Sequence, residues 1–198
     1  MTTVFIIRGY DLSGTATDPV FDDMTQQLED KGYRVHRVDI SWLDITISQY
    51  LEKFVQIYEK EKTYHNIIIG SSLGAIVTVL AAPIVNPNKV VVSSLSPYWK
   101  ENYLDVPGVH ERGLRKFGPD LTDDAGQNSW RACIQNLIDS GVEHIFTYGE
   151  LEKTEYPWLP EFNKKIESEF SEIDLREIPG APHSLHIPVH YQDIVNLL

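Results

Sequence analysis

The chain has 198 residues, of which 42% are hydrophobic and 23% are charged. This composition is typical of a globular protein with a full core, and a length near one typical domain predicts a single domain with an insertion. The 29 acidic residues outnumber the 17 basic ones and give a formal net charge of −12. That charge argues against nucleic acid as a partner, because phosphate binding needs an excess of Lys and Arg on some face.

Three features of the sequence bear on where the protein is found in the cell. Cys133 is the only cysteine, so the sequence offers no intrachain disulfide and no cysteine-based zinc site. The N-terminus has no basic region ahead of its apolar run and does not resemble a signal peptide. Residues 67–85 carry no charge, but glycine and serine at 70–74 and Pro83 favour a buried strand followed by a buried helix over a membrane span. We expect a cytoplasmic protein with no membrane partner.

Apolar runs of strand length alternate with helical patterns along the chain. In chain order, the sequence predicts a strand at 4–8, a helix at 18–31, a strand at 34–39, a helix at 47–61, a strand at 66–70, a helix at 72–82, a strand at 89–94, a helix at 129–140, a strand at 144–148, a helix at 156–170, a strand at 175–178 and a helix at 189–198. Pro19 and Pro188 suit first helical positions, and Gly32 and Gly141 suit helix ends. The alternation predicts an α/β fold with a parallel sheet and right-handed crossovers.

The segment 96–128 interrupts this alternation with prolines, glycines and mixed charges. A connection of this length inside a compact domain is typically functional or mobile. We expect an irregular segment that is either a cap over the carboxyl edge of the sheet or an ordinary surface excursion. Tyr98 and Trp99 could line an acyl or aromatic pocket for substrate under such a cap, although aromatic residues pack against the domain just as often.

The pattern Gly70-Ser71-Ser72-Leu73-Gly74 lies between a buried strand and a buried helix. A serine between two glycines in this context is typical of the nucleophile elbow. Side chains at Gly70 and Gly74 would collide with neighbouring backbone in so tight a turn. Ser72 would then stand clear of the sheet, at the positive end of a helix. The alternative is a glycine-rich turn that only lets the helix pack closely.

A serine nucleophile also needs donors for the charge that develops on the substrate oxygen. The backbone N–H of Leu73 is one donor by its position after Ser72. A second donor is expected from the loop after the first strand, where Gly9 lets the chain turn and the N–H of Tyr10 can point at the developing charge.

In element order the whole chain resembles the α/β-hydrolase superfamily, without the family's first two strands. The resemblance implies a three-layer sandwich with a mainly parallel six-stranded sheet in the order 2-1-3-4-5-6, and no cofactor. Ligands would bind at the switch point between strands one and three, where Tyr10 and Ser72 would meet. Arg8 replaces the usual histidine of the family's His-Gly pair, and it could bind an acidic group of the substrate or pair with Asp11 or Asp39.

The family order places the catalytic base after the last strand. Gly180-Ala181-Pro182-His183 resembles the family's Gly-x-Gly-His loop, with Pro182 replacing the second glycine. The resemblance implies His183 as the general base, with His186 as its rival. His183, His186 and His190 could also line one helical face as a metal site, but Pro182 and Pro188 interrupt any helix there, so we expect no metal.

The acid of the triad should follow the fifth strand. The segment from 144 to 157 resembles the family loop Gly-x-x-Asp and puts Glu152 on the aspartate position. Glu150 is the rival, and Glu155 is also within reach of a shifted loop. The acid would hold the neutral imidazole in the right tautomer and stabilise the imidazolium. The alternative for all three glutamates is a solvated acidic loop.

Together these features predict a serine hydrolase that cleaves a small-molecule carboxylic ester, thioester or amide through an acyl-Ser72 intermediate. Two alternatives stay open. One is a lyase, peptidase or acyltransferase on the same site. The other is a non-catalytic protein that binds a ligand in the same cleft, because Arg8, Glu152 and Pro182 depart from the common pattern.

Overall fold

A single parallel sheet forms the centre of the molecule. The computed structural model describes residues 1–10, 21–185 and 187–198. Its six strands are β1 (Thr2–Ile7), β2 (Arg34–Arg37), β3 (His65–Ser71), β4 (Lys89–Ser93), β5 (Glu143–Gly149) and β6 (Asp174–Ile178). They pair in the order β2-β1-β3-β4-β5-β6, and each neighbouring pair is parallel. The predicted fold class and sheet order are therefore confirmed.

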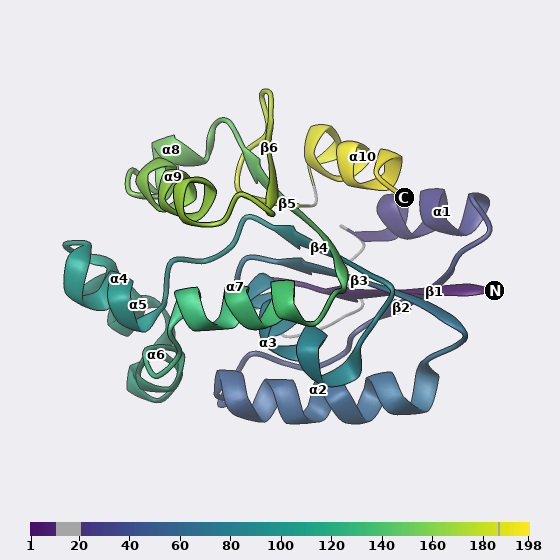
Figure 1. Cartoon of the computed structure of the whole chain (residues 1–198), viewed down its shortest axis with the longest axis horizontal. Helices are drawn as coiled ribbons and strands as arrows, with labels where there is room; N and C mark the ends of the chain where they lie inside the picture. The colour runs from purple at the N-terminus through teal and green to yellow at the C-terminus, as the bar shows by residue number, and fades with distance from the viewer. Residues whose placement is uncertain (11–20, 186) are drawn as a thin grey trace.

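Helices cover both faces of this sheet (Figure 1). The longer ones are α1 (Asp22–Asp30), α2 (Ile47–Glu61), α3 (Leu73–Val85), α7 (Trp130–Asp139), α9 (Leu159–Glu169) and α10 (Pro188–Asn196). Helices α1 and α10 contact each other on one face, and α2 and α7 flank α3 on the other. The helix predicted from 156 begins later because Pro160, at its second position, suits a helix start rather than an interior. The predicted start at 18 and Pro19 lies outside the described residues.

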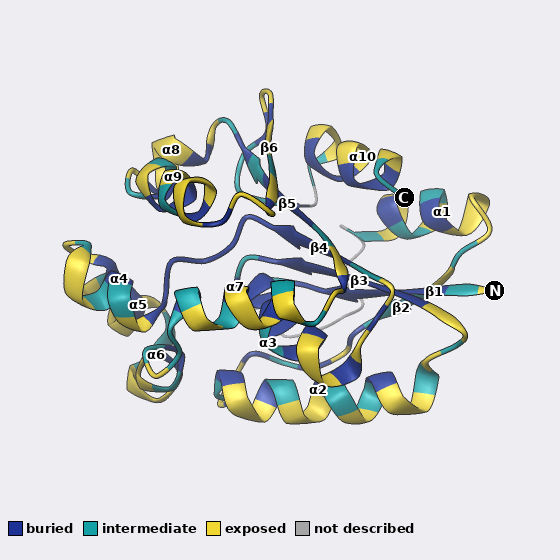
Figure 2. Cartoon of the chain, viewed as in Figure 1, coloured by how far each residue is buried: buried dark blue, intermediate teal, exposed yellow. Residues whose placement is uncertain are grey.

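The two faces of the sheet bury separate apolar clusters. Successive side chains of β1 alternate between them: Val4 and Ile6 pack with α1 and α10, whereas Phe5 and Ile7 pack with α2 and α3. This is the period of two that a strand imposes. Figure 2 shows the central strands buried and the outer faces of the helices exposed. Burial on both faces explains why the central strands are continuous Ile and Val runs.

The segment 96–128 is helical, and the expectation of an irregular segment is wrong in this respect. It forms α4 (Lys100–Asp105), α5 (Val109–Phe117) and α6 (Pro119–Ala125). Gly108 and Gly118 join these helices with φ angles of 82° and 81°. Glycine adopts such angles without steric cost, so these residues separate helices instead of marking a loop. Figure 1 shows the three helices grouped beyond the carboxyl ends of the central strands.

The uncharged stretch 67–85 divides between β3 and α3. Among the described residues, no helix has the length and apolar character needed to cross a membrane.

Candidate active site

Ser72 is the single residue between β3, which ends at Ser71, and α3, which begins at Leu73. Its φ is 56° and its ψ is −116°. Non-glycine residues seldom adopt a positive φ, and such strain persists only where the surroundings fix it. The Ser72 N–H donates to the carbonyl oxygen of Ser93 at 3.0 Å, which ties the turn to the neighbouring strand.

The glycines around Ser72 are required by close backbone contacts. A Cβ atom on Gly74 would lie 2.3 Å from the carbonyl oxygen of Ile7, and one on Gly70 would lie 2.4 Å from that of Gly74. On Gly9 it would lie 2.7 Å from Cβ of Ser72. The helix after Ser72 and the loop after β1 therefore approach more closely than any side chain would allow.

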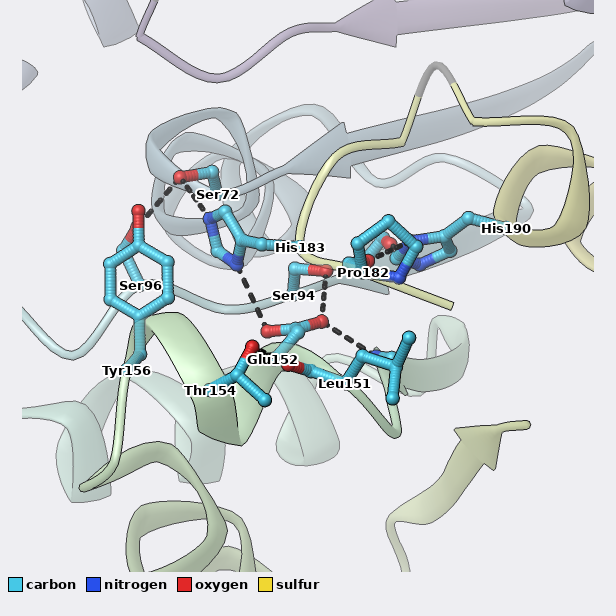
Figure 3. Close-up of polar contacts among 12 residues, drawn as sticks. Ser72, Ser94, Ser96, Leu151, Glu152, Thr154, Tyr156, Pro182, His183 and His190 are labelled. Atoms are coloured by element: carbon cyan, nitrogen blue, oxygen red, sulfur yellow. Dashed lines mark hydrogen bonds and ion pairs between the residues drawn. The ribbon is translucent and has the colours of Figure 1, made fainter. Parts of the chain in front are cut away.

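A chain of hydrogen bonds joins Ser72, His183 and Glu152 (Figure 3). Ser72 Oγ lies 3.0 Å from His183 Nε2, and His183 Nδ1 lies 2.9 Å from Glu152 Oε2. A carboxylate only accepts, so Nδ1 carries the ring proton and donates it to Glu152. The lone pair of Nε2 then accepts the hydroxyl proton of Ser72. This is the arrangement in which an imidazole can take a proton from a serine.

The Glu152 carboxylate is 2% exposed and fully engaged. Its Oε1 atom accepts from the Ser94 hydroxyl and from the Gly149 N–H, each at 2.6 Å. Glu152 is the first residue of α8 (Glu152–Glu155), so its side chain turns back toward the end of β5. Three donors offset the cost of burying a carboxylate and fix its orientation toward His183.

Glu150 takes a different position from Glu152. Its Oε2 atom accepts the Gly180 N–H at 2.9 Å, so it supports the turn that precedes the His183 loop. The structure therefore places Glu152 against the imidazole, while Glu150 binds the backbone of the preceding turn. His186, the rival of His183, lies outside the described residues.

Solved structures share this architecture. A carboxylesterase of Nitrososphaera gargenis is 16% identical, with a TM-score of 0.62 over 99% of this chain and 91% of its own. Est1E from Butyrivibrio proteoclasticus is 16% identical, with a TM-score of 0.67 over 99% of this chain and 84% of its own. The thioesterase domain from the curacin biosynthetic pathway is 14% identical, with a TM-score of 0.68 over 99% of this chain and 90% of its own. The chain has the α/β-hydrolase fold. No family model matches the sequence, and no curated protein sequence matches it.

Leu73 and Tyr10, the residues predicted to supply backbone donors, belong to the two segments that meet at Ser72. The Leu73 N–H is at the first position of α3, where helix geometry provides no intrahelical acceptor. Tyr10 follows Gly9, which touches Ser72, and its ring packs 4.8 Å from the ring of Phe117 in α5. The Leu73 N–H thus begins the helix after Ser72, and the Tyr10 N–H belongs to the loop after β1.

The three residues suggested for substrate contact are buried. Arg8 is 5% exposed, and the charges of Arg8 and Asp39 both act on the pKa of the Tyr50 hydroxyl, which burial raises. This position beside α2 favours the structural role over contact with a substrate. Tyr98 and Trp99 belong to the main apolar cluster. Their burial favours packing, the alternative that the sequence left open.

Three residues at the site were not singled out from the sequence: Ser94, Ser96 and Tyr156. His190 was considered there only as a possible metal ligand. The Tyr156 ring lies 4.5 Å from the His183 ring, and Arg112 of α5 lies 4.4 Å above the Tyr156 ring. A usable signal was the run of three serines at 93, 94 and 96, because polar residues at the carboxyl end of a central parallel strand face the ligand site.

His183 and His190, the two described members of the predicted histidine trio, each bind protein groups. His183 binds Ser72 and Glu152, while His190 binds Ser93 and the Pro182 carbonyl oxygen. Within the ranges that the structure describes, no three His, Cys, Asp or Glu side chains are grouped to hold a metal ion.

Proposed function

We propose that this chain is a serine hydrolase that cleaves a carboxylic ester of a small molecule. The observation that carries the proposal is the hydrogen-bonded chain from Ser72 through His183 to Glu152, with Ser72 at a strained turn before a helix. The fold is shared with proteins described as carboxylesterases and as a thioesterase, which supports hydrolysis of an acyl bond.

In this proposal Ser72 Oγ attacks the carbonyl carbon while its proton moves to His183 Nε2. The carbonyl oxygen becomes an oxyanion that the N–H groups of Leu73 and Tyr10 stabilise. When the carbon–oxygen bond to the leaving alcohol breaks, His183 returns the proton to that alcohol. Water then attacks the acyl-Ser72 carbonyl, with His183 again as the base, and releases the acid and free Ser72. Glu152 keeps the imidazole in one tautomer throughout.

We also propose that α4, α5 and α6 form a cap over this site. The Tyr156 ring contacts both the His183 ring and the Arg112 guanidinium of α5. A single aromatic ring therefore connects α5 to the catalytic imidazole. A cap in this position would set the size and polarity of the acyl or alcohol group that is accepted.

The first test is the intact mass of the protein after incubation with a fluorophosphonate, which traps activated serines. We expect one adduct on the wild type and none on Ser72→Ala. His183→Gln keeps the Ser72 hydroxyl but removes the base, and we expect labelling at least about 100-fold slower. Hydrolysis of short-chain p-nitrophenyl esters should follow the same order. A folded wild type without adduct and without esterase activity would overturn the proposal.

A further inference from the structure

The carboxyl end of β4 carries three buried hydroxyls that reach three parts of the site. Ser93 Oγ lies 2.9 Å from His190 Nε2, and Ser94 Oγ donates to Glu152. Ser96 Oγ lies 3.0 Å from Ser72 Oγ, as the dashed lines in Figure 3 show. Ser96 therefore contacts the atom that the proposed mechanism makes the nucleophile.

The direction of the Ser96–Ser72 hydrogen bond follows from counting protons. Glu152 accepts, so His183 donates from Nδ1 and must accept at Nε2. In the neutral imidazole, Nε2 accepts from the group bonded to it, the Ser72 hydroxyl, which has one proton. That proton is engaged with His183, so the proton between the two serine oxygens has to come from Ser96.

We propose that Ser96 is a further catalytic residue, whose hydroxyl donates a hydrogen bond to Ser72 Oγ during the reaction. The proposal rests on the proposed function, because it needs Ser72 as nucleophile. By filling one acceptor position of Oγ, Ser96 leaves the Ser72 proton directed at His183. A donor beside Oγ also stabilises the negative charge that this oxygen gains as its proton leaves.

The same contact acts again when the acyl-enzyme is hydrolysed. The bond between the acyl carbon and Ser72 Oγ then breaks, the electron pair stays on Oγ, and His183 returns a proton to it. Ser96 transfers no proton in either step and only donates a hydrogen bond. Its effect should therefore appear in acylation and in deacylation alike.

The surroundings of Ser96 hold it in place for this role. Its side chain is 2% exposed, and its carbonyl oxygen accepts the ring N–H of Trp99 at 2.8 Å. The next carbonyl, of Pro97, accepts from the Asn102 amide at 2.9 Å. Trp99 and Asn102 are themselves buried, so the start of the cap fixes the backbone that carries Ser96. This gives Trp99 a positioning role in place of substrate contact.

The test compares Ser96→Ala with Thr147→Val as a matched control. Thr147 is a buried residue of β5 that pairs with Ser93 of β4. Its hydroxyl has no hydrogen-bond partner among the described residues. We measure the rate constant of fluorophosphonate labelling, then kcat and KM for an ester. Ser96→Ala should lower the labelling rate and kcat about 10- to 100-fold with KM little changed. Thr147→Val should stay within about twofold of the wild type, since its hydroxyl makes no bond that is lost.

Ser96→Thr keeps the hydroxyl, and its rates should lie closer to the wild type than those of Ser96→Ala. Labelling of Ser96→Ala at the wild-type rate or faster would overturn the role, because a faster rate means that Ser96 competes with His183 for the Ser72 proton. If Ser96→Thr or Thr147→Val lowers the labelling rate as much as Ser96→Ala does, the role is overturned too, because the loss is then an effect of packing. If the wild type itself is not labelled, the proposed function fails. If the wild type is labelled and Ser96→Ala is labelled at the same rate, only the role of Ser96 fails.

Discussion

Glu152 occupies the place where the family pattern has an aspartate, and its longer side chain is accommodated by local geometry. The side chain folds back from α8 so that its carboxylate also accepts from the Gly149 N–H. Gly149 also lets the His183 loop come close, because a Cβ atom at this position would lie 2.2 Å from the carbonyl oxygen of Ala181. The end of β5 and the His183 loop are therefore in close backbone contact, and this brings Glu152 and His183 together.

This geometry predicts different outcomes at the two neighbouring glutamates. In Glu152→Gln one of the two accepting oxygens becomes an NH2 group. Because the oxygen that remains is needed by Ser94 and Gly149, the NH2 group would face His183 Nδ1 and oppose the required tautomer. We expect kcat for an ester to fall about 10³- to 10⁴-fold. Glu150→Gln keeps an oxygen that can accept the Gly180 N–H, and we expect less than about a threefold change. Steady-state kinetics of the two purified variants would decide. Equal losses in both would contradict the assignment of the acid.

At the scale of elements, the site depends on how closely α3 and β1 approach. The first turn of α3 touches the end of β1 through Gly74, which leaves no room for a side chain against the Ile7 carbonyl. Ser72 is held at a positive φ because both the strand before it and the helix after it are fixed in the core. The strain at the turn is thus maintained by the packing of whole elements.

Gly74→Ala should therefore be among the most destabilising small substitutions in the chain. We expect a loss of about 3 kcal/mol or more in the free energy of unfolding, because the obstacle is backbone and the core has little freedom to move. Gly32→Ala is the control: Gly32 has a φ of 88° and nothing within 4 Å of a Cβ atom. Its cost should be about 1 kcal/mol, from the backbone angle alone. Urea unfolding measures both, and similar costs would contradict this account.

At the scale of the whole molecule, His190 joins the last helix to the centre of the sheet. It is fully buried in α10, and its Nδ1–H donates to the Pro182 carbonyl oxygen at 3.0 Å. Nε2 is then left to accept from Ser93 in β4. Burial lowers the pKa of His190, which opposes the smaller raising effect of the Glu152 charge. The native state therefore favours the neutral form of this histidine more than the unfolded chain does.

A lowered pKa in the native state makes stability depend on pH. The unfolded chain binds a proton at this histidine as the pH falls through about 6.5, whereas the native state binds it only at a lower pH. The free energy of unfolding should thus fall as the pH drops from 7.5 to 5.5, by at most about 1.4 kcal/mol per pH unit for this group. In His190→Asn, the free energy of unfolding measured with urea should fall less steeply over this pH range than in the wild type. His65→Asn, at an exposed histidine, should retain the wild-type slope, and equal slopes in all three proteins would refute the prediction.

The sequence by itself determined the order of the elements, the α/β class and the glycine-flanked turn that holds Ser72. These follow from local patterns, because strand and helix periodicity and the steric demand for glycine are properties of short segments. The resemblance to a known family added the sheet order and selected Glu152 and His183 from several acids and histidines.

Only the tertiary structure decided which hydroxyls reach the site. Ser96 contacts Ser72, which is 24 residues away in the sequence, and Ser94 contacts Glu152, which is 58 residues away. His190 contacts Ser93 across 97 residues. Such contacts depend on how β4 is placed between β3 and β5 and on where the chain leaves the sheet, which no local pattern encodes. Packing also placed Tyr98 and Trp99 in the core, because apolar burial outweighs exposure of large aromatic rings at a cap surface.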